Sequence, residues 1–310
     1  MPTDTEARAR RVVAREVTER RGWLSSVWTT RTRSVIKELV AHLFLIPISI
    51  TMVIPLYWLF TTSLKPKGMV FTYPPQWIPN PIRWENYPEA LTILPFHLFF
   101  KNSMVYCVTI LIGQVLVSTL VGYGFARLRF PGRDLIFWLV LIRMMLPGAV
   151  TMVPSYVMFS KMGWVNTLLP LVVPGWLPGL YSGSFYIFLC RQFFMGIPLE
   201  LDDAAKIDGA GHIRIWWQII LPLSKPVIAT VAIFSFITHW NDFMGPLIYL
   251  HDVERQTLAL SILTFQGAHD TEWHWLMAVS SLMVVPVIIL FFSAQRYFLQ
   301  GISMTGITGR

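Results

Sequence analysis

Six long apolar segments, separated by polar connections, limit the folds open to this chain of 310 residues. Each is close to or above the roughly 20 helical residues that cross about 30 Å of hydrocarbon at 1.5 Å per residue. Soluble domains rarely contain such segments, and here 54% of the residues are hydrophobic and only 14% are charged. The sequence therefore predicts an all-α integral membrane protein. The predicted transmembrane helices cover residues 39–64, 102–126, 135–160, 163–190, 227–250 and 274–296.

The positions of Lys and Arg predict the orientation of these segments. The side that holds the N-terminus, the connections 127–134 and 191–226 and the C-terminal tail carries 18 basic residues. The opposite side carries six, and Arg143 lies within a predicted span. Because cytoplasmic loops are enriched in Lys and Arg, we expect both termini in the cytoplasm. This pattern explains the net charge of +8 by topology, so we expect a membrane lipid surface and no nucleic-acid partner.

The predicted membrane region, 39–303, lies between a basic N-terminal extension, 1–38, and a short C-terminal tail, 304–310. The extension carries nine basic residues and fits two descriptions, a basic amphipathic helix on an anionic leaflet or a solvated, partly disordered tail. The first outer loop, 65–101, is rich in proline and aromatic residues. It suits either the lipid headgroup zone or a protein surface.

Proline and glycine interrupt the third and fourth predicted spans at Pro147-Gly148, Pro154, Pro170, Pro174-Gly175 and Pro178-Gly179. Proline removes a backbone donor and glycine permits close helix contacts. We therefore expect kinks in both spans.

The cytoplasmic stretch 197–226 is predicted to form a helix, a turn and a second helix. Pro198 suits the first helical turn, three acidic residues follow it, and Gly209 suits the stop of a helix ending near Asp208. In the second helix Ile213, Trp216, Trp217 and Ile220 are spaced to share one apolar face. The alternative is a loop that lies on the bilayer with its tryptophans in the interface.

This stretch resembles the cytoplasmic EAA motif of ABC importer permeases. The matching positions, with family spacing throughout, are Asp203, Ala204, Ala205, Asp208, Gly209, Ala210, Ile219, Leu221 and Pro222. The one departure is Asp203, where the family usually has glutamate, so the reach of that carboxylate is one methylene shorter.

Further segments are similar to the carbohydrate branch of that family, typified by the second permease of maltose-type importers. They are the outer loop around Pro74 to Tyr87, Gly122 to Arg127, Arg191 to Phe194, Trp240 to Asp242 and Gln295 to Phe298. The resemblance covers about residues 35–303 of this sequence.

The resemblance implies a multi-pass subunit of a bacterial-type plasma (inner) membrane that imports a sugar or sugar derivative. Its implied partners are a second permease subunit, two copies of a cytoplasmic ATPase and an extracytoplasmic solute-binding protein. The chain itself would be no enzyme and would hold no cofactor, because ATP and Mg would be bound by the ATPase. In agreement, the sequence has no G-x-x-x-x-G-K-[ST] phosphate-binding loop.

Polar residues within predicted spans are candidates for a solute pathway: Arg143, His239, Trp240, Asn241 and Asp242. An aromatic ring can stack on a sugar face, and amide and carboxylate groups can bind hydroxyls. For Arg143 the alternative is a structural or snorkelling arginine, and for the other four it is packing of the fifth span.

Two other function classes stay open at this stage. An ATP-independent channel or ion-coupled carrier would transport without an ATPase, and a membrane enzyme would need a catalytic constellation. His269, Asp270, Glu272 and His274 have no recognisable metal-ligand spacing, and His239 with Asp242 has no recognisable catalytic spacing.

Overall fold

The computed structural model describes residues 35–178, 183–266 and 271–304, with side chains described up to Gln295. This part of the chain is helical, with one isolated antiparallel bridge between Gln266 and Thr271. Residues 1–34 and 305–310 lie outside it, and so do the predictions made for the extension and for the tail.

The chain divides into two compact units, 1–60 and 61–310. The described residues of the first unit belong to a helix that begins at Val35 and extends to Ser63, long and apolar enough to cross a membrane. This helix corresponds to the first predicted span.

The second unit contains helices of very different lengths. Their bounds are α2 Asn86–Ile93, α3 Phe96–Arg127, α4 Arg133–Met145, α5 Gly148–Lys161, α6 Leu169–Val172, α7 Gly183–Met195, α8 Glu200–Ile207, α9 His212–Ile215, α10 Leu221–Leu223, α11 Lys225–Trp240, α12 Met244–Tyr249, α13 Leu258–Ser261 and α14 Trp273–Met304. Short 3-10 turns cover Lys67–Met69, Val173–Trp176, Val253–Arg255 and Ile262–Phe265.

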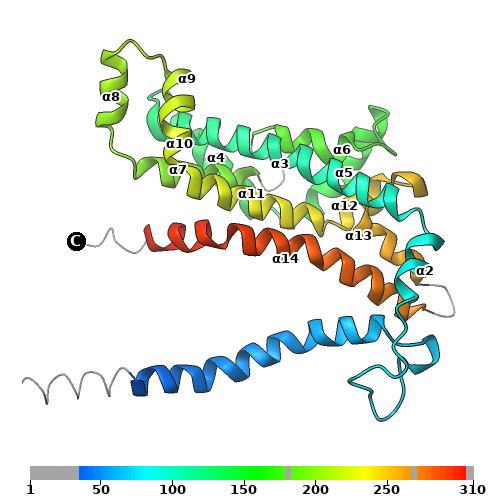
Figure 1. Ribbon diagram of the computed structural model, residues 1–310. Coiled ribbons are helices and arrows are strands. Elements are labelled where there is room, and N and C mark those ends of the chain that lie inside the picture. Colours follow the sequence, from blue (N-terminus) through cyan, green and yellow to red (C-terminus); the bar gives the residue numbers. More distant parts are fainter. Residues whose placement is uncertain (1–34, 179–182, 267–270, 305–310) are drawn as a thin grey trace, which may run out of the picture. The chain divides into compact units, whose positions relative to one another are not determined.

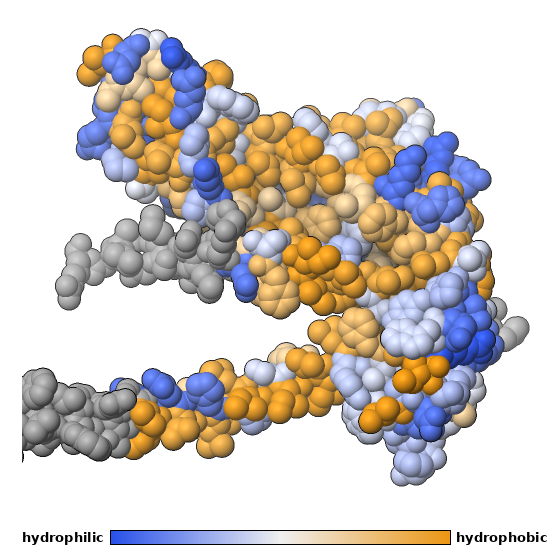
Figure 2. All heavy atoms as spheres, in the orientation of Figure 1, coloured by the Kyte–Doolittle hydropathy of each residue, from blue (hydrophilic) through white to orange (hydrophobic). Residues whose placement is uncertain are grey.

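The long helices α3, α11 and α14 form the centre of the second unit. Helix α3 packs against α7 and α11, α11 packs against α14, and α14 packs against α2. Figure 1 shows α3, α11 and α14 running alongside one another, with α8 and α9 at one end of the bundle and α2 and α13 towards the other. In Figure 2 hydrophilic residues gather at these two ends of the unit and hydrophobic ones cover the surface between them. This pattern suits a bundle with a lipid-facing belt.

Three helices of the described chain, Val35–Ser63, Phe96–Arg127 and Trp273–Gln295, are each long and apolar enough to cross a membrane. Two bent pairs raise the number to five if each pair is one span: α4 with α5, bent by 99°, and His212–Leu223 with α11, bent by 82°. The first bend falls at Leu146 and Pro147, which confirms the predicted kink there, since proline cannot donate to the preceding turn.

The fourth predicted span, 163–190, is not a single long helix. It contains α6, a 3-10 turn over Val173–Trp176 and the first part of α7, which continues to Met195. Pro170 and Pro174 each lie at the start of one of these short helices, where their rings are tolerated. The prediction treated the prolines as kinks within one helix, whereas they separate helices.

Glycines let α3 approach its neighbours closely. A Cβ on Gly122 would lie 2.8 Å from the Cβ of Cys190 on α7, and one on Gly113 would lie 2.5 Å from the indole ring of Trp176. By contrast, a Cβ on Gly124 would meet no atom within 4 Å. The close packing of α3 against α7 thus depends on Gly122.

Candidate functional site

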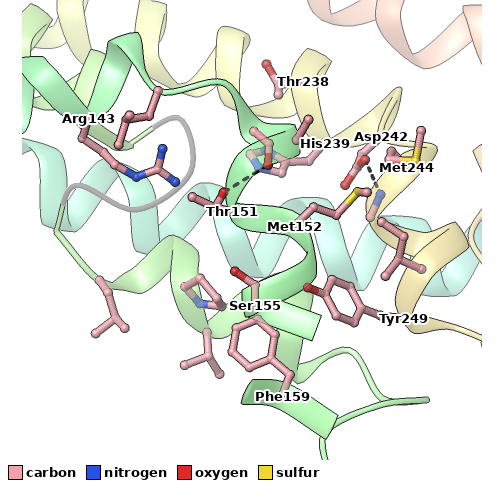
Figure 3. Close-up of a pocket in the computed structure, with 18 of the residues that line it drawn as sticks. Arg143, Thr151, Met152, Ser155, Phe159, Thr238, His239, Asp242, Met244 and Tyr249 are labelled. Carbon is pink, nitrogen blue, oxygen red and sulfur yellow. Dashed lines mark hydrogen bonds between the residues drawn. The ribbon is translucent and has the colours of Figure 1, made fainter. Parts of the chain in front are cut away.

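A cavity of about 1270 Å³ lies in the second unit, bounded by residues of α3, α4, α5, α7, α11 and α12. Its lining is mainly apolar and rich in methionine and aromatic side chains, with a few polar groups. Figure 3 shows Arg143 on the α4 side of this cavity and Asp242 on the α11–α12 side, with Thr151 and Met152 between them. A concave site with a few polar groups in apolar walls is typical of small-molecule binding.

The carboxylate of Asp242 is held in place by two donors. The Tyr106 hydroxyl of α3 donates to its Oδ2 at 2.8 Å, and the Gly245 backbone N–H donates to its Oδ1 at 3.0 Å. Asp242 follows the end of α11, so its carboxylate links α11, α12 and α3. This network fixes the polar side of the cavity wall.

His239 lies beside this network, one turn earlier on α11. Its Nδ1 is 2.6 Å from the Ser235 carbonyl oxygen, which can only accept, so Nδ1 carries the proton. Its ring meets the Tyr106 ring edge-on at 5.5 Å. The side chain is only 5% exposed and lines the cavity.

Arg143 occupies the last turn of α4, just before the 99° bend into α5. Its side chain lines the cavity and is partly exposed. Within the described ranges, no acidic side chain lies within 4.0 Å of its guanidinium. The sequence placed Arg143 and Asp242 at different depths, and the structure likewise forms no ion pair between them.

Two of the five predicted pathway residues, Trp240 and Asn241, lie outside the cavity lining. The Trp240 ring is 2% exposed and stacks on Phe236 at 5.4 Å, and its indole N–H donates to the Met283 carbonyl oxygen at 3.0 Å. The Asn241 amide is exposed and donates to the Ile237 carbonyl oxygen at 2.9 Å. The structure therefore places Arg143, His239 and Asp242 in the lining of one cavity, whereas Trp240 and Asn241 are not part of that lining.

The sequence did not single out several polar side chains of the cavity: Tyr106, Thr151, Ser155, Thr238 and Tyr249. They lie on four different helices and share no local spacing. Only Thr238 could have been found from the sequence, because it directly precedes His239, which was a predicted pathway residue.

The stretch 197–226 forms the predicted helix, turn and second helix. Helix α8, Glu200–Ile207, is followed by the capping residue Asp208, and Gly209 adopts a left-handed conformation with φ of +78°. The Gly209 N–H donates to the Lys206 carbonyl oxygen at 3.0 Å, and the Ala210 N–H donates to that of Ala205 at 2.9 Å. Gly209 is thus the predicted stop, because glycine alone takes this conformation without strain.

The predicted apolar face of the second helix is wrong for Ile213 and Trp217, whose side chains are 66% and 59% exposed. Ile215, Trp216 and Ile220 are buried instead. Residues Trp216–Ile220 form a π-helical turn, whose wider winding changes which residues share a face. Spacing based on 3.6 residues per turn could not predict this shift.

Asp202 anchors α8 to the transmembrane bundle. Its Oδ2 lies 3.6 Å from Nε of Arg127, at the end of α3, and both side chains are almost fully buried. Nη2 of Arg127 also donates to the Ile197 carbonyl oxygen at 2.7 Å. The sequence indicated only acidic residues in the first turn, so this pairing across 75 positions was not predicted.

The opposite side of α8 is exposed. Ile207 is 87% exposed and Leu201 40% exposed. Ala204 and Asp203 are exposed too, and Asp203 pairs with Lys206 at 3.0 Å. Of the predicted Ala204-Ala205 patch only Ala204 is accessible, since Ala205 packs into the core under the helix.

The remaining predicted coupling residues differ in their exposure. Asp208, Gly209 and Pro222 are exposed, whereas Ala210, Ile219 and Leu221 are partly buried and pack against a cluster of buried side chains from α3, α7, α8, α11 and the stretch 215–220. An exposed helix with apolar and acidic residues, held from below, can serve as a contact for another protein.

Within the same described ranges, no group of three or more His, Cys, Asp or Glu side chains is arranged to hold a metal ion. His269 and Asp270 lie outside these ranges.

Comparison with known proteins identifies relatives over most of the chain. The sequence profile of the family "Binding-protein-dependent transport system inner membrane component" matches residues 114–304. The sn-glycerol-3-phosphate transport system permease protein UgpE of Yersinia pestis is 32% identical over 274 residues, covering 86% of this chain and 95% of that protein. UgpE of Brucella abortus is 30% identical over 279 residues, covering 87% and 97%.

A solved structure supports the fold. A chain from the crystal structure of a bacterial ABC transporter involved in the import of the acidic polysaccharide alginate matches with a TM-score of 0.75. The match covers 85% of this chain and 96% of that chain at 21% sequence identity.

Proposed function

The chain belongs to the family of binding-protein-dependent transport system inner membrane components, and on that premise we propose that its cavity is part of the pathway for a sugar or sugar derivative. As a member of this family it is a multi-pass inner-membrane permease subunit of an ABC importer, and a partner ATPase hydrolyses the ATP. The named relatives transport sn-glycerol-3-phosphate.

The observation that carries the proposal is the cavity, with its few fixed polar groups inside an otherwise apolar helix bundle. The Tyr106 hydroxyl, the His239 imidazole and the Asp242 carboxylate lie in one wall of the cavity. Two hydroxyl groups of α5, those of Thr151 and Ser155, also line it. Such groups can exchange hydrogen bonds with a hydroxylated solute, while the broken helices around them allow irregular backbone at membrane depth.

The second part of the proposal concerns coupling. We assign the contact with the ATPase to the exposed side of α8, with Asp203, Ala204, Asp208 and Gly209 at its centre. The exposed Ile207 would add apolar area to this contact. The resemblance to the EAA motif and the anchoring of α8 through Asp202 both support this assignment.

The further parts of the proposal concern assembly and orientation. The complex would contain a second permease subunit, two ATPase copies and an extracytoplasmic binding protein, and Mg and ATP would bind the ATPase. Six spans with both termini in the cytoplasm fit the basic-residue distribution, with the region 163–195 supplying a broken fourth span.

Ala204→Glu tests the coupling contact. The larger, charged side chain should prevent close approach to α8, so we expect loss of the ATPase that co-purifies with the wild-type complex. Gln218→Glu is the matched control, because it adds the same charge at another exposed site of the stretch. Membrane insertion of both variants is checked by their amount in the membrane fraction.

Equal ATPase recovery with Ala204→Glu and with wild type would argue against α8 as the docking site. Solute uptake into liposomes that contain this chain and no ATPase would instead support a channel or a carrier.

A further inference from the structure

Arg143 is a cation in a place where a cation is costly. It lies inside a predicted span, and intramembrane arginines usually have an acidic partner, a carbonyl partner or a functional task. Among the described residues the Arg143 guanidinium forms no hydrogen bond or ion pair, although the Arg143 backbone carbonyl accepts from the Leu146 N–H, and the side chain lines the cavity. Its five N–H donors match the geometry of carboxylate and phosphate groups.

The carboxylate and the imidazole that line the cavity, those of Asp242 and His239, are engaged with their own neighbours. Both oxygens of Asp242 accept hydrogen bonds, from Tyr106 and from Gly245. His239 donates through Nδ1 to the Ser235 carbonyl oxygen. The Asp242 carboxylate is therefore committed to the wall, whereas the Arg143 guanidinium faces the open volume (Figure 3).

The bend next to Arg143 brings two helix ends of opposite partial charge, the negative C-terminus of α4 and the positive N-terminus of α5, to this side of the cavity. Gly148 and Ala149, the first residues of α5, also line it. The two partial charges oppose each other, so the full charge of the guanidinium dominates at this side of the cavity.

We propose that Arg143 binds the anionic group of the transported solute, and that this solute is a sugar derivative bearing a phosphate or a carboxylate. The hydroxyls of the same solute would face the side of Asp242 and His239. This inference rests on the proposed function of the cavity and specifies the solute class. Because the anion and the carboxylate lie on opposite sides, the solute would enter the cavity in one orientation.

The test measures ATP-dependent uptake by the complete transporter, with its binding protein, in proteoliposomes. Three radiolabelled probes separate the anion types: sn-glycerol-3-phosphate, galacturonate and the neutral sugar maltose. We expect uptake of at least one anionic probe. Arg143→Gln should raise the KM for that probe by about tenfold or more, because a charge-assisted contact is lost. Arg143→Lys should restore part of the affinity, since it keeps the charge without the bidentate geometry.

Lys161→Gln is the matched control. It removes one positive charge at the other end of α5, and Lys161 does not line the cavity. We expect an unchanged KM for this variant. Recovery of intact complex and its basal ATPase rate show whether Arg143→Gln still folds and assembles.

Uptake of neither anionic probe, or an unchanged KM in an assembled Arg143→Gln complex, would overturn the proposal. ATP-driven uptake of maltose alone would refute the anionic solute while the importer function stands. Failure of any ATPase to co-purify would instead refute the proposed function itself.

Discussion

The pair formed by Asp202 and Arg127 joins helix α8 to the end of α3. Both side chains are almost fully buried, so neither charge has water to stabilise it. In such a pair the attraction largely offsets the cost of burial, and removal of one partner leaves an uncompensated charge. The pair is therefore expected to position α8 more than to raise overall stability.

We predict that Asp202→Asn or Arg127→Gln alone destabilises the protein by about 3 kcal/mol, measured by denaturant unfolding in mixed micelles. The double variant should recover part of this loss, because it removes both charges. Asp203→Asn is the control: its exposed pair with Lys206 should contribute about 0.5 kcal/mol or less.

Additive losses in the double variant would show that the two charges do not interact. A loss for Asp203→Asn as large as for Asp202→Asn would show that α8 tolerates no change of charge on either side.

Among the helices, the contact of α3 with α7 depends on the absence of a side chain at Gly122. A Cβ there would lie 2.8 Å from the Cβ of Cys190 and 3.2 Å from the Arg191 backbone nitrogen. Because one of these neighbours is backbone, the helices themselves must move apart.

We predict that Gly122→Ala destabilises the protein by about 1 to 3 kcal/mol through overpacking, measured by the same unfolding assay. Gly124→Ala on the same helix is the control, since a Cβ there meets nothing within 4 Å. It should be neutral or slightly stabilising, because alanine favours helix. Similar effects of the two substitutions would contradict a steric contact at Gly122.

Sequence periodicity and composition predicted the elements whose causes are local. The long apolar helices at Val35–Ser63, Phe96–Arg127 and Trp273–Met304, the break at Pro147 and the stop at Gly209 all follow from a residue and its near neighbours. The division of the region 163–190 into short helices was not predicted, because closely spaced prolines can either kink a helix or end it.

The sequence predicted the site residues that stand out within their own segment, and it missed those whose role depends on a distant partner. Arg143, His239 and Asp242 stood out as polar residues in apolar segments, and they line the cavity. Tyr106, the partner of Asp242, has no such signal, since a tyrosine is ordinary in a membrane helix. The burial of Asp202 rather than Asp203 likewise depends on Arg127, which lies far away in the sequence.

For the complete chain, we predict that both termini lie in the cytoplasm. Cys107 and Cys190 are buried thiols, so they should react slowly with a membrane-impermeant maleimide. In spheroplasts this reagent should label Ile78→Cys, in the exposed outer loop, but Thr308→Cys only after permeabilisation. The reverse labelling pattern would show the opposite orientation. Helix α8 would then lie on the side of the membrane that a cytoplasmic ATPase cannot reach.

Helix α3 has one more consequence. It runs from Phe96 to Arg127 without a proline, and it carries both Tyr106 in the cavity wall and Arg127 beneath α8. These two residues are about 32 Å apart along the axis at 1.5 Å per residue. If α3 moves as a rigid body, a tilt of about 10° around one of these two residues displaces the other by roughly 5 Å. A tilt of α3 that follows a movement of α8 would thus move the Tyr106 hydroxyl that holds Asp242.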